Sequence, residues 1–118
     1  MMGERNRDPL RGTGRTTRML TKALVNFYRY AFTGRHVLVI FADFGECIVG
    51  AEMLCKIAMD AGMNVDYDSR FLIVTVSGMA DTTVRYKFSP PMDRNLHVLG
   101  LYADRYIDHN VRGDARDT

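Results

Sequence analysis

The sequence predicts one small α/β domain with a mostly parallel sheet and a hairpin. Its 118 residues, 47% of them hydrophobic and 25% charged, suit a single globular domain with its own core. Two segments carry apolar residues at steps of three and four, the period of an amphipathic helix, and runs rich in β-branched residues predict strands. We therefore expect residues 1–118 to form one domain with flexible ends at residues 1–8 and 111–118.

Helices and strands alternate in the first half of the chain. A helix is predicted from residue 16 to about residue 31, and Gly34 is its stop signal. The continuous apolar run over residues 36–42 predicts a strand covered on both faces, as strands of a parallel sheet are. A second amphipathic helix is predicted over residues 46–61.

The second half of the chain predicts a hairpin and two shorter elements. Residues 71–76 form an apolar run, and residues 82–88 alternate polar with apolar side chains, so residues 78–81 are expected to form the turn between two strands. After a Ser-Pro-Pro break, residues 97–102 and 105–108 predict short strands or turns. The tail from Asn110 is expected to fray.

The composition and the N-terminal residues limit where in the cell the protein is expected. No apolar run approaches the roughly 20 residues that cross a bilayer, and the polar N-terminus lacks the apolar segment of a signal peptide. Cys47 and Cys55 are eight residues apart on a predicted helix, which separates their backbones by roughly 12 Å and favours reduced thiols over a disulfide. We expect a cytoplasmic protein with no membrane partner, and a homo-oligomer is consistent with so small a core.

Positive charge is concentrated near the N-terminus. Residues 1–35 hold eight Lys or Arg against two acids, whereas residues 36–118 hold eight against twelve. A segment of this kind attracts nucleotide phosphates, a nucleic-acid backbone or an acidic protein surface, and charge alone does not choose among them.

A glycine-containing loop precedes the first predicted helix. Residues 11–17 read RGTGRTT, and glycines at a helix N-terminus let backbone N–H groups approach the oxygens of an anion. Thr16 is placed to offer a hydroxyl to a phosphate-bound Mg²⁺, and Arg15 to face the phosphates. The competing interpretation is a flexible entry to the helix, with Thr13 or Thr16 as a cap, and spacing alone leaves both open.

The loop departs from the phosphate-loop pattern G-x-x-x-x-G-K-[ST] in two places. Pro9 stands at the position of the first glycine, and Arg15 replaces the lysine with a bulkier, forked cation. Phosphate loops also follow a buried strand, whereas residues 1–8 are almost entirely polar. The predicted sheet is therefore truncated, or is completed by another chain.

The loop and a C-terminal motif together resemble small bacteriophage-encoded P-loop proteins, which are themselves similar to the ATPase halves of helicases and large terminases. The resemblance spans roughly residues 9–110 and ends with residues 106–109, which read YIDH. It implies a small, truncated, three-layer P-loop NTPase-like domain in which Asp108 is similar to the acidic residue of a Walker B strand and holds Mg²⁺ opposite Thr16. The nucleotide-binding residues that it implies are Gly12, Thr13, Gly14, Arg15, Thr16 and Thr17.

The resemblance implies that the chain binds an NTP, with Mg-ATP as the expected ligand, in the host cytoplasm if the protein is viral. His109 occupies the position of the water-activating glutamate, so it is the candidate base or γ-phosphate sensor, and we expect weak hydrolysis or none. Asp43 and Glu46 follow the first strong strand, where they face a ligand or cap the next helix.

The alternative is a non-enzymatic phage adaptor or inhibitor that binds nucleic acid or a host protein through its basic N-terminal third. Under this alternative, five arginines form a phosphate-contacting patch whose affinity falls with salt: Arg5, Arg7, Arg11, Arg15 and Arg18.

Overall fold

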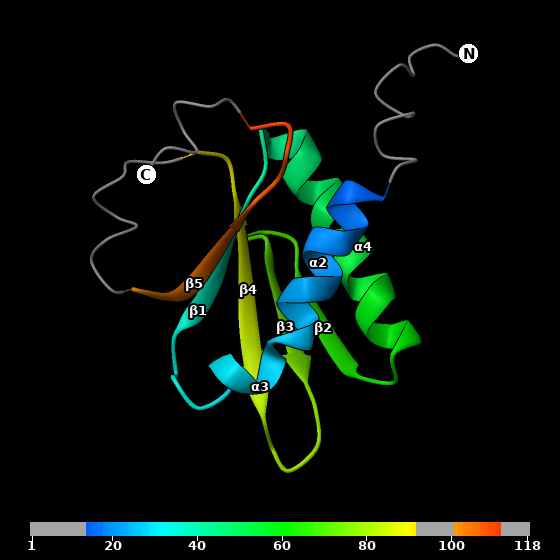
Figure 1. Ribbon diagram of the computed structural model, residues 1–118, viewed down its shortest axis with the longest axis vertical. Helices are drawn as coiled ribbons and strands as arrows, with labels where there is room; N and C mark the ends of the chain where they lie inside the picture. The colour runs from blue at the N-terminus through cyan, green and yellow to red at the C-terminus, as the bar shows by residue number, and fades with distance from the viewer. Residues whose placement is uncertain (1–13, 92–100, 112–118) are drawn as a thin grey trace.

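The chain forms an α/β domain with a five-stranded mixed sheet and helices packed on it (Figure 1). The structure is a computed structural model that describes residues 14–91 and 101–111. Its elements are, in chain order, α2 (Arg15–Val25), α3 (Phe27–Tyr30), β1 (His36–Ile40), α4 (Phe44–Asp60), β2 (Asn64–Asp68), β3 (Ile73–Ser77), β4 (Thr83–Ser89) and β5 (Tyr102–Ile107).

The sheet has the strand order β2-β3-β4-β1-β5. β1 lies between β4 and β5 and is parallel to both, whereas β3 is antiparallel to both β2 and β4. The expectation of a mostly parallel sheet is therefore wrong. The reason is that β2, β3 and β4 follow one another through short turns, which only antiparallel neighbours can use, while parallel neighbours need a long crossover.

The predicted hairpin is confirmed as β3 and β4. Gly78 N–H donates to the Thr82 carbonyl at 2.9 Å at the base of its turn, and Ala80 and Asp81 adopt positive φ values of 61° and 59°. The hairpin ends at the same edge of the domain as the connection between α3 and β1 (Figure 1).

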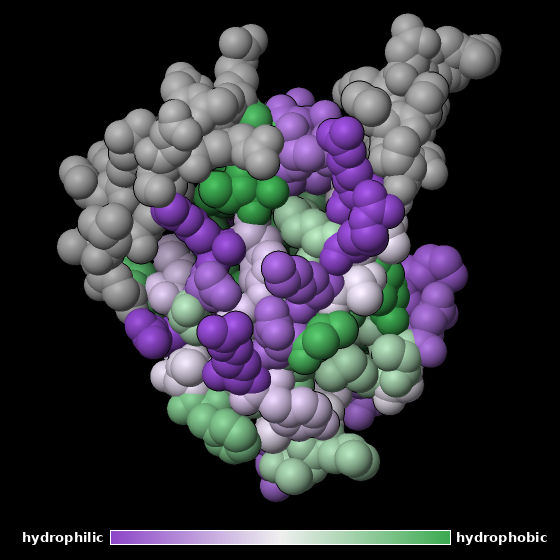
Figure 2. Space-filling model, in the orientation of Figure 1, coloured by the Kyte–Doolittle hydropathy of each residue, from purple (hydrophilic) through white to green (hydrophobic). Residues whose placement is uncertain are grey.

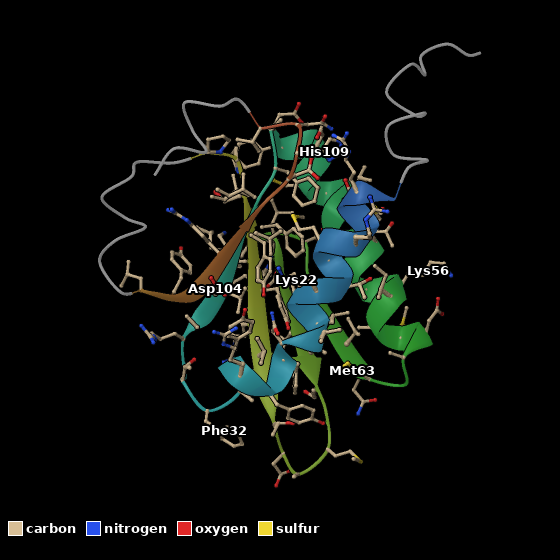
Figure 3. The ribbon with its side chains drawn as sticks, in the orientation of Figure 1. Lys22, Phe32, Lys56, Met63, Asp104 and His109 are labelled. Carbon is tan, nitrogen blue, oxygen red and sulfur yellow. The ribbon has the colours of Figure 1, made fainter. Side chains whose placement is uncertain are left out.

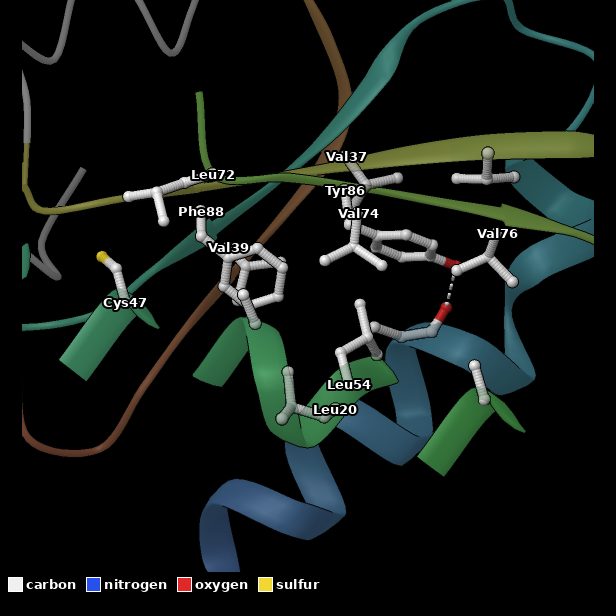
Figure 4. Close-up of a cluster of buried hydrophobic side chains, with 14 of the residues drawn as sticks. Leu20, Val37, Val39, Cys47, Leu54, Leu72, Val74, Val76, Tyr86 and Phe88 are labelled. Atoms are coloured by element: carbon white, nitrogen blue, oxygen red, sulfur yellow. Dashed lines mark hydrogen bonds between the residues drawn. The ribbon is translucent and has the colours of Figure 1, made fainter. Parts of the chain in front are cut away.

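The main core lies between one face of the sheet and the helices. Along β1, Val37 and Val39 belong to this core, whereas Leu38 and Ile40 point to the other face and pack with Val111. Figure 4 shows helical leucines facing sheet residues across the interface. The core residues contributed by the helices are Leu20, Ala23, Phe27, Tyr30, Cys47, Ala51, Leu54 and Ala58.

Helices cover a single face of the sheet within residues 14–91 and 101–111, so the three-layer arrangement is not observed in that part of the chain. Val111, in the tail expected to fray, is 4% exposed because it packs on the face opposite to the helices. No helix in the described ranges has the length and apolar character needed to cross a bilayer.

The predicted first helix is interrupted at Asn26. α2 ends at Val25, and α3 begins one residue later and lasts a single turn. Two contacts with the sheet hold this break: the Asn26 side-chain amide donates to the Tyr106 hydroxyl at 2.9 Å, and the buried Tyr86 hydroxyl donates to the Ala23 carbonyl at 3.0 Å (Figure 4).

Two strands differ from their predicted form. β2 had no counterpart in the sequence prediction, and it is a mostly polar edge strand that pairs only with β3 among the described residues. Near the C-terminus, residues 102–107 form one strand, β5, instead of parts of two short elements, and residues 97–100 of the first of these lie outside the described residues.

Candidate functional site

The structure brings together two of the predicted site residues, Thr16 and Asp108. Thr16 lies in the first turn of α2 and is 6% exposed, and Asp108 follows β5 and is 1% exposed. The Thr16 hydroxyl donates a hydrogen bond to Asp108 Oδ1 at 2.7 Å, across 92 residues of sequence. The start of α2 and the carboxyl end of β5 therefore meet at one buried polar contact.

Local backbone contacts hold Asp108 in place. Its N–H donates to the Ile40 carbonyl at 2.9 Å, which continues the pairing of β5 with the end of β1. Its second carboxylate oxygen, Oδ2, accepts from the Asn110 N–H at 3.2 Å. Both oxygens of the buried carboxylate thus have a donor, and its orientation is fixed by the strand end.

Gly14 provides the entry to α2. It adopts a left-handed conformation, with φ 81° and ψ 11°, and its carbonyl accepts from the Arg18 N–H at 2.8 Å. Glycine tolerates this conformation without the steric cost that a Cβ imposes. The N-cap residue of α2 therefore brings no side chain to the first turn, and that turn contains no acidic residue.

The remaining residues of the predicted loop are divided between the surface and the undescribed segment. Arg15 and Thr17 are exposed in the first turn of α2, so neither lies with Asp108 in the interior. Gly12 and Thr13 lie outside the described residues.

His109 lies beside the Thr16–Asp108 contact, at the end of the domain where α2 begins (Figure 3). Its side chain is 14% exposed, and its Nδ1 atom is 3.5 Å from Asp108 Oδ1, too far for a hydrogen bond of ordinary strength. Both ring nitrogens are buried and have no hydrogen-bond partner among residues 14–91 and 101–111. A buried unsatisfied polar atom costs about 1–3 kcal/mol, so this ring gains from any ligand or water that reaches it.

A small cavity adjoins the buried pair. Its volume is about 10 Å³, close to the space that one water molecule requires. It is lined by Thr16, Phe41, Glu46, Val49, Met53, Asp108 and Asn110.

Glu46 is a site residue that the phosphate-loop motifs do not include, although its position after the first strong strand made it a candidate to face a ligand. It lies in the first turn of α4 and lines the cavity together with Thr16 and Asp108. The neighbouring acid, Asp43, has the capping role that was one of its two interpretations, because its Oδ1 accepts the Glu46 N–H at 2.8 Å. The available signal was the position of Glu46 just after a buried strand, at the edge of the sheet where ligands of α/β proteins bind.

The oxygen atoms at this site suit a Mg²⁺ ion that arrives with phosphates. Mg²⁺ prefers oxygen ligands, keeps several waters, and is commonly held by one or two carboxylates together with the phosphates of a substrate. The Thr16 hydroxyl and the Asp108 carboxylate match that donor set. Among the described residues, no group of three His, Cys, Asp or Glu side chains is arranged to hold a metal ion without further ligands.

The two cysteines are free, Cys47 buried and Cys55 half-buried. Burial raises the pKa of the Cys47 thiol to about 11 and also raises the pKa of Cys55. Because the thiolate is the nucleophilic form, both residues are structural thiols, as the sequence predicted.

Comparison with known proteins finds no matching family model, no similar curated protein and no similar solved structure.

Proposed function

We propose that this chain is a degenerate P-loop domain that binds a nucleoside triphosphate with Mg²⁺, with ATP as the expected nucleotide and weak hydrolysis or none. The observation that carries the proposal is the buried hydrogen bond between Thr16 and Asp108. A hydroxyl at a helix N-terminus and a carboxylate at the end of a neighbouring strand are the two protein groups that a phosphate-bound Mg²⁺ requires in P-loop proteins.

The two long helices differ at their N-termini in a way that supports the proposal. In α4, Asp43 caps the first turn and Glu46 adds a second carboxylate there. In α2, Gly14 offers no side chain, and the first turn contains no acid. The N–H groups that begin α2 and the positive end of its dipole are therefore suited to an external anion, and Arg15 adds a cation beside them.

His109 and Glu46 are the two groups that could act on the phosphate end of the nucleotide. His109 has two buried nitrogens without partners, which fits a base or a γ-phosphate sensor. Glu46 lines the same cavity as Thr16 and Asp108, but it belongs to α4 instead of following Asp108 directly. Because the usual glutamate position holds a histidine, we keep hydrolysis weak or absent in the proposal.

The test is the thermal midpoint of the protein with and without millimolar Mg-ATP. A ligand at about 100 times its dissociation constant adds roughly 2.7 kcal/mol to the free energy of unfolding, which raises the midpoint of a domain this size by several degrees. Thr16→Ser keeps the hydroxyl and should keep the shift, whereas Thr16→Val should lose it. Thr21→Val, on the exposed surface of the same helix, is the matched control and should shift like the wild type.

EDTA should remove most of the shift, because the proposed site holds Mg²⁺ together with the nucleotide. The proposal is wrong if Mg-ATP leaves the wild-type midpoint unchanged, or if Thr16→Val and Thr21→Val respond alike.

A further inference from the structure

A row of cations follows one side of the first helical segment. α2 and α3 together contain Arg15, Arg18, Lys22 and Arg29 and no acidic residue. At 100° per residue, Arg15, Arg18 and Lys22 fall within about 60° of one another on α2, and Arg29 follows in α3, past the break at Asn26. All four residues are exposed, and we call them the cationic stripe.

The cationic stripe borders an open groove between the helices and the last strand. The groove has a volume of about 570 Å³. It is lined by Met19, Lys22, Asn26, Arg29, Asp104, Arg105, Tyr106 and Ile107, and we call it the basic groove. Figure 3 shows Lys22 on the side of α2 that faces Asp104 of β5, and Figure 2 shows hydrophilic side chains over this part of the surface.

Charge in the basic groove is predominantly positive. Among the described residues that line it, Asp104 is the single carboxylate, against three cationic side chains. The oxygens of Asp104 are already engaged, because Oδ2 accepts from the Tyr30 hydroxyl at 2.6 Å and Oδ1 from the Arg105 N–H at 2.8 Å. Lys22 and Arg29 form no ion pair with any described carboxylate. An anionic partner would therefore meet two cations, Lys22 and Arg29, that have no competing carboxylate among the described residues.

We propose that the cationic stripe and the basic groove bind single-stranded nucleic acid. Along α2 the stripe extends for about 10 Å from Arg15 to Lys22, at the 1.5 Å rise per residue of a helix, and Arg29 follows in α3, so cations are presented at several points along an extended polyanion. The groove adds an aromatic ring, Tyr106, and apolar side chains, Met19 and Ile107, beside those cations. Cations for the phosphates and apolar or aromatic surface for the bases are the combination that single strands require.

A second copy of this chain is a poorer occupant of the groove. If two copies paired their β5 strands antiparallel about a twofold axis, odd-numbered residues would face odd-numbered residues and even-numbered residues would face even-numbered ones. In the two registers that overlap most, either Asp104 or Arg105 faces the same residue of the other copy. Like charges in directly opposite positions destabilise a sheet. The two cationic stripes would add to the repulsion. The proposal does not depend on nucleotide binding, since Lys22, Arg29 and the basic groove lie apart from the Thr16–Asp108 cavity, although the stripe begins at Arg15.

The test is fluorescence anisotropy of a labelled 20-nucleotide oligo-dT strand, titrated with the full chain in the absence of nucleotide at several salt concentrations. The double variant Lys22→Gln/Arg29→Gln should weaken binding and lower the slope of log affinity against log salt by about 1.4, because each phosphate contact on a single strand contributes about 0.7. Both side chains are exposed, so the thermal midpoint should stay near that of the wild type.

The matched control is Lys56→Gln/Arg70→Gln, which removes the same charge from α4 and the β2–β3 turn, outside the basic groove. Binding by the control should stay within about twofold of the wild type. Equal weakening by both double variants would overturn the proposal, because it would indicate net charge instead of a surface. Three other results would overturn it as well: no binding by the wild type at low salt, equal competition by polyglutamate, or tighter binding of duplex than of single-stranded DNA.

Discussion

The hydrogen bond between Thr16 and Asp108 should contribute measurably to stability in the absence of any ligand. A hydrogen bond to a charged group contributes about 1.5–3 kcal/mol to the free energy of unfolding. Asp108 is 1% exposed, so bulk solvent does not replace the Thr16 hydroxyl when it is removed. Thr16→Val, which keeps the branched shape but deletes the donor, should therefore lower the free energy of unfolding by about 1.5–3 kcal/mol.

A double-mutant cycle isolates this contact from the other effects of each change. Urea unfolding of Thr16→Val, Asp108→Ala and the double variant should give a coupling energy of about 1.5–3 kcal/mol. Thr21→Val is the control, and as an exposed substitution on the same helix it should change stability by less than about 0.5 kcal/mol. A coupling energy below about 0.5 kcal/mol would refute the assignment of a specific, buried bond between these two side chains.

Three further predictions concern the rest of the domain. Tyr86→Phe removes the donor to the Ala23 carbonyl and should cost about 1–3 kcal/mol in urea unfolding, whereas an unchanged midpoint would mean that this bond does not hold α2 to the sheet. Burial and two cations on β4 lower the pKa of His36 in the folded protein. As the pH falls, the unfolded chain therefore binds a proton before the folded protein does, and stability should fall below about pH 6.5. His36→Gln should flatten that part of a stability–pH curve. Gly50→Ala would overlap the Phe41 ring and should lower stability by about 1–3 kcal/mol, against a much smaller effect of the exposed Ile48→Ala; equal effects would contradict the close packing of α4 on Phe41.

The elements that the sequence predicted correctly are those whose own residues determine them. β1 consists of β-branched and apolar residues that are buried from Val37 onward, and such a run has few alternatives to a central strand. The apolar run and the alternating run on either side of the turn at residues 78–81 likewise predicted β3 and β4 as a hairpin.

The elements that the sequence missed depend on contacts with distant residues. The helical period continues through Asn26, and the interruption there is held by Tyr106 and Tyr86, which are 80 and 60 residues further along the chain. β2 is an edge strand and mostly polar, so the order of its polar and apolar residues does not predict a strand. Its pairing with β3 makes it one. Apolar runs are similar in parallel and antiparallel strands, so they did not predict the direction of the strands. The lengths of the connections between strands determine that direction.

The candidate site was predictable in part. Thr16 and Asp108 could be paired in advance because each belongs to a short motif, and the structure places them in contact. Glu46 could not be ranked above Asp43, because the cavity that it lines forms only when α4 packs beside α2 and the end of β5.

The distance in sequence between Thr16 and Asp108 also bears on how the domain folds. Closing a loop of that size costs conformational entropy before any contact compensates for it, whereas the β3–β4 hairpin closes over a few residues. A partly folded chain can therefore contain the hairpin, and even α4 packed on it, while the two halves of the candidate site remain apart. Site formation is then a late event, and ligand binding there reports on the completely folded population instead of on local structure.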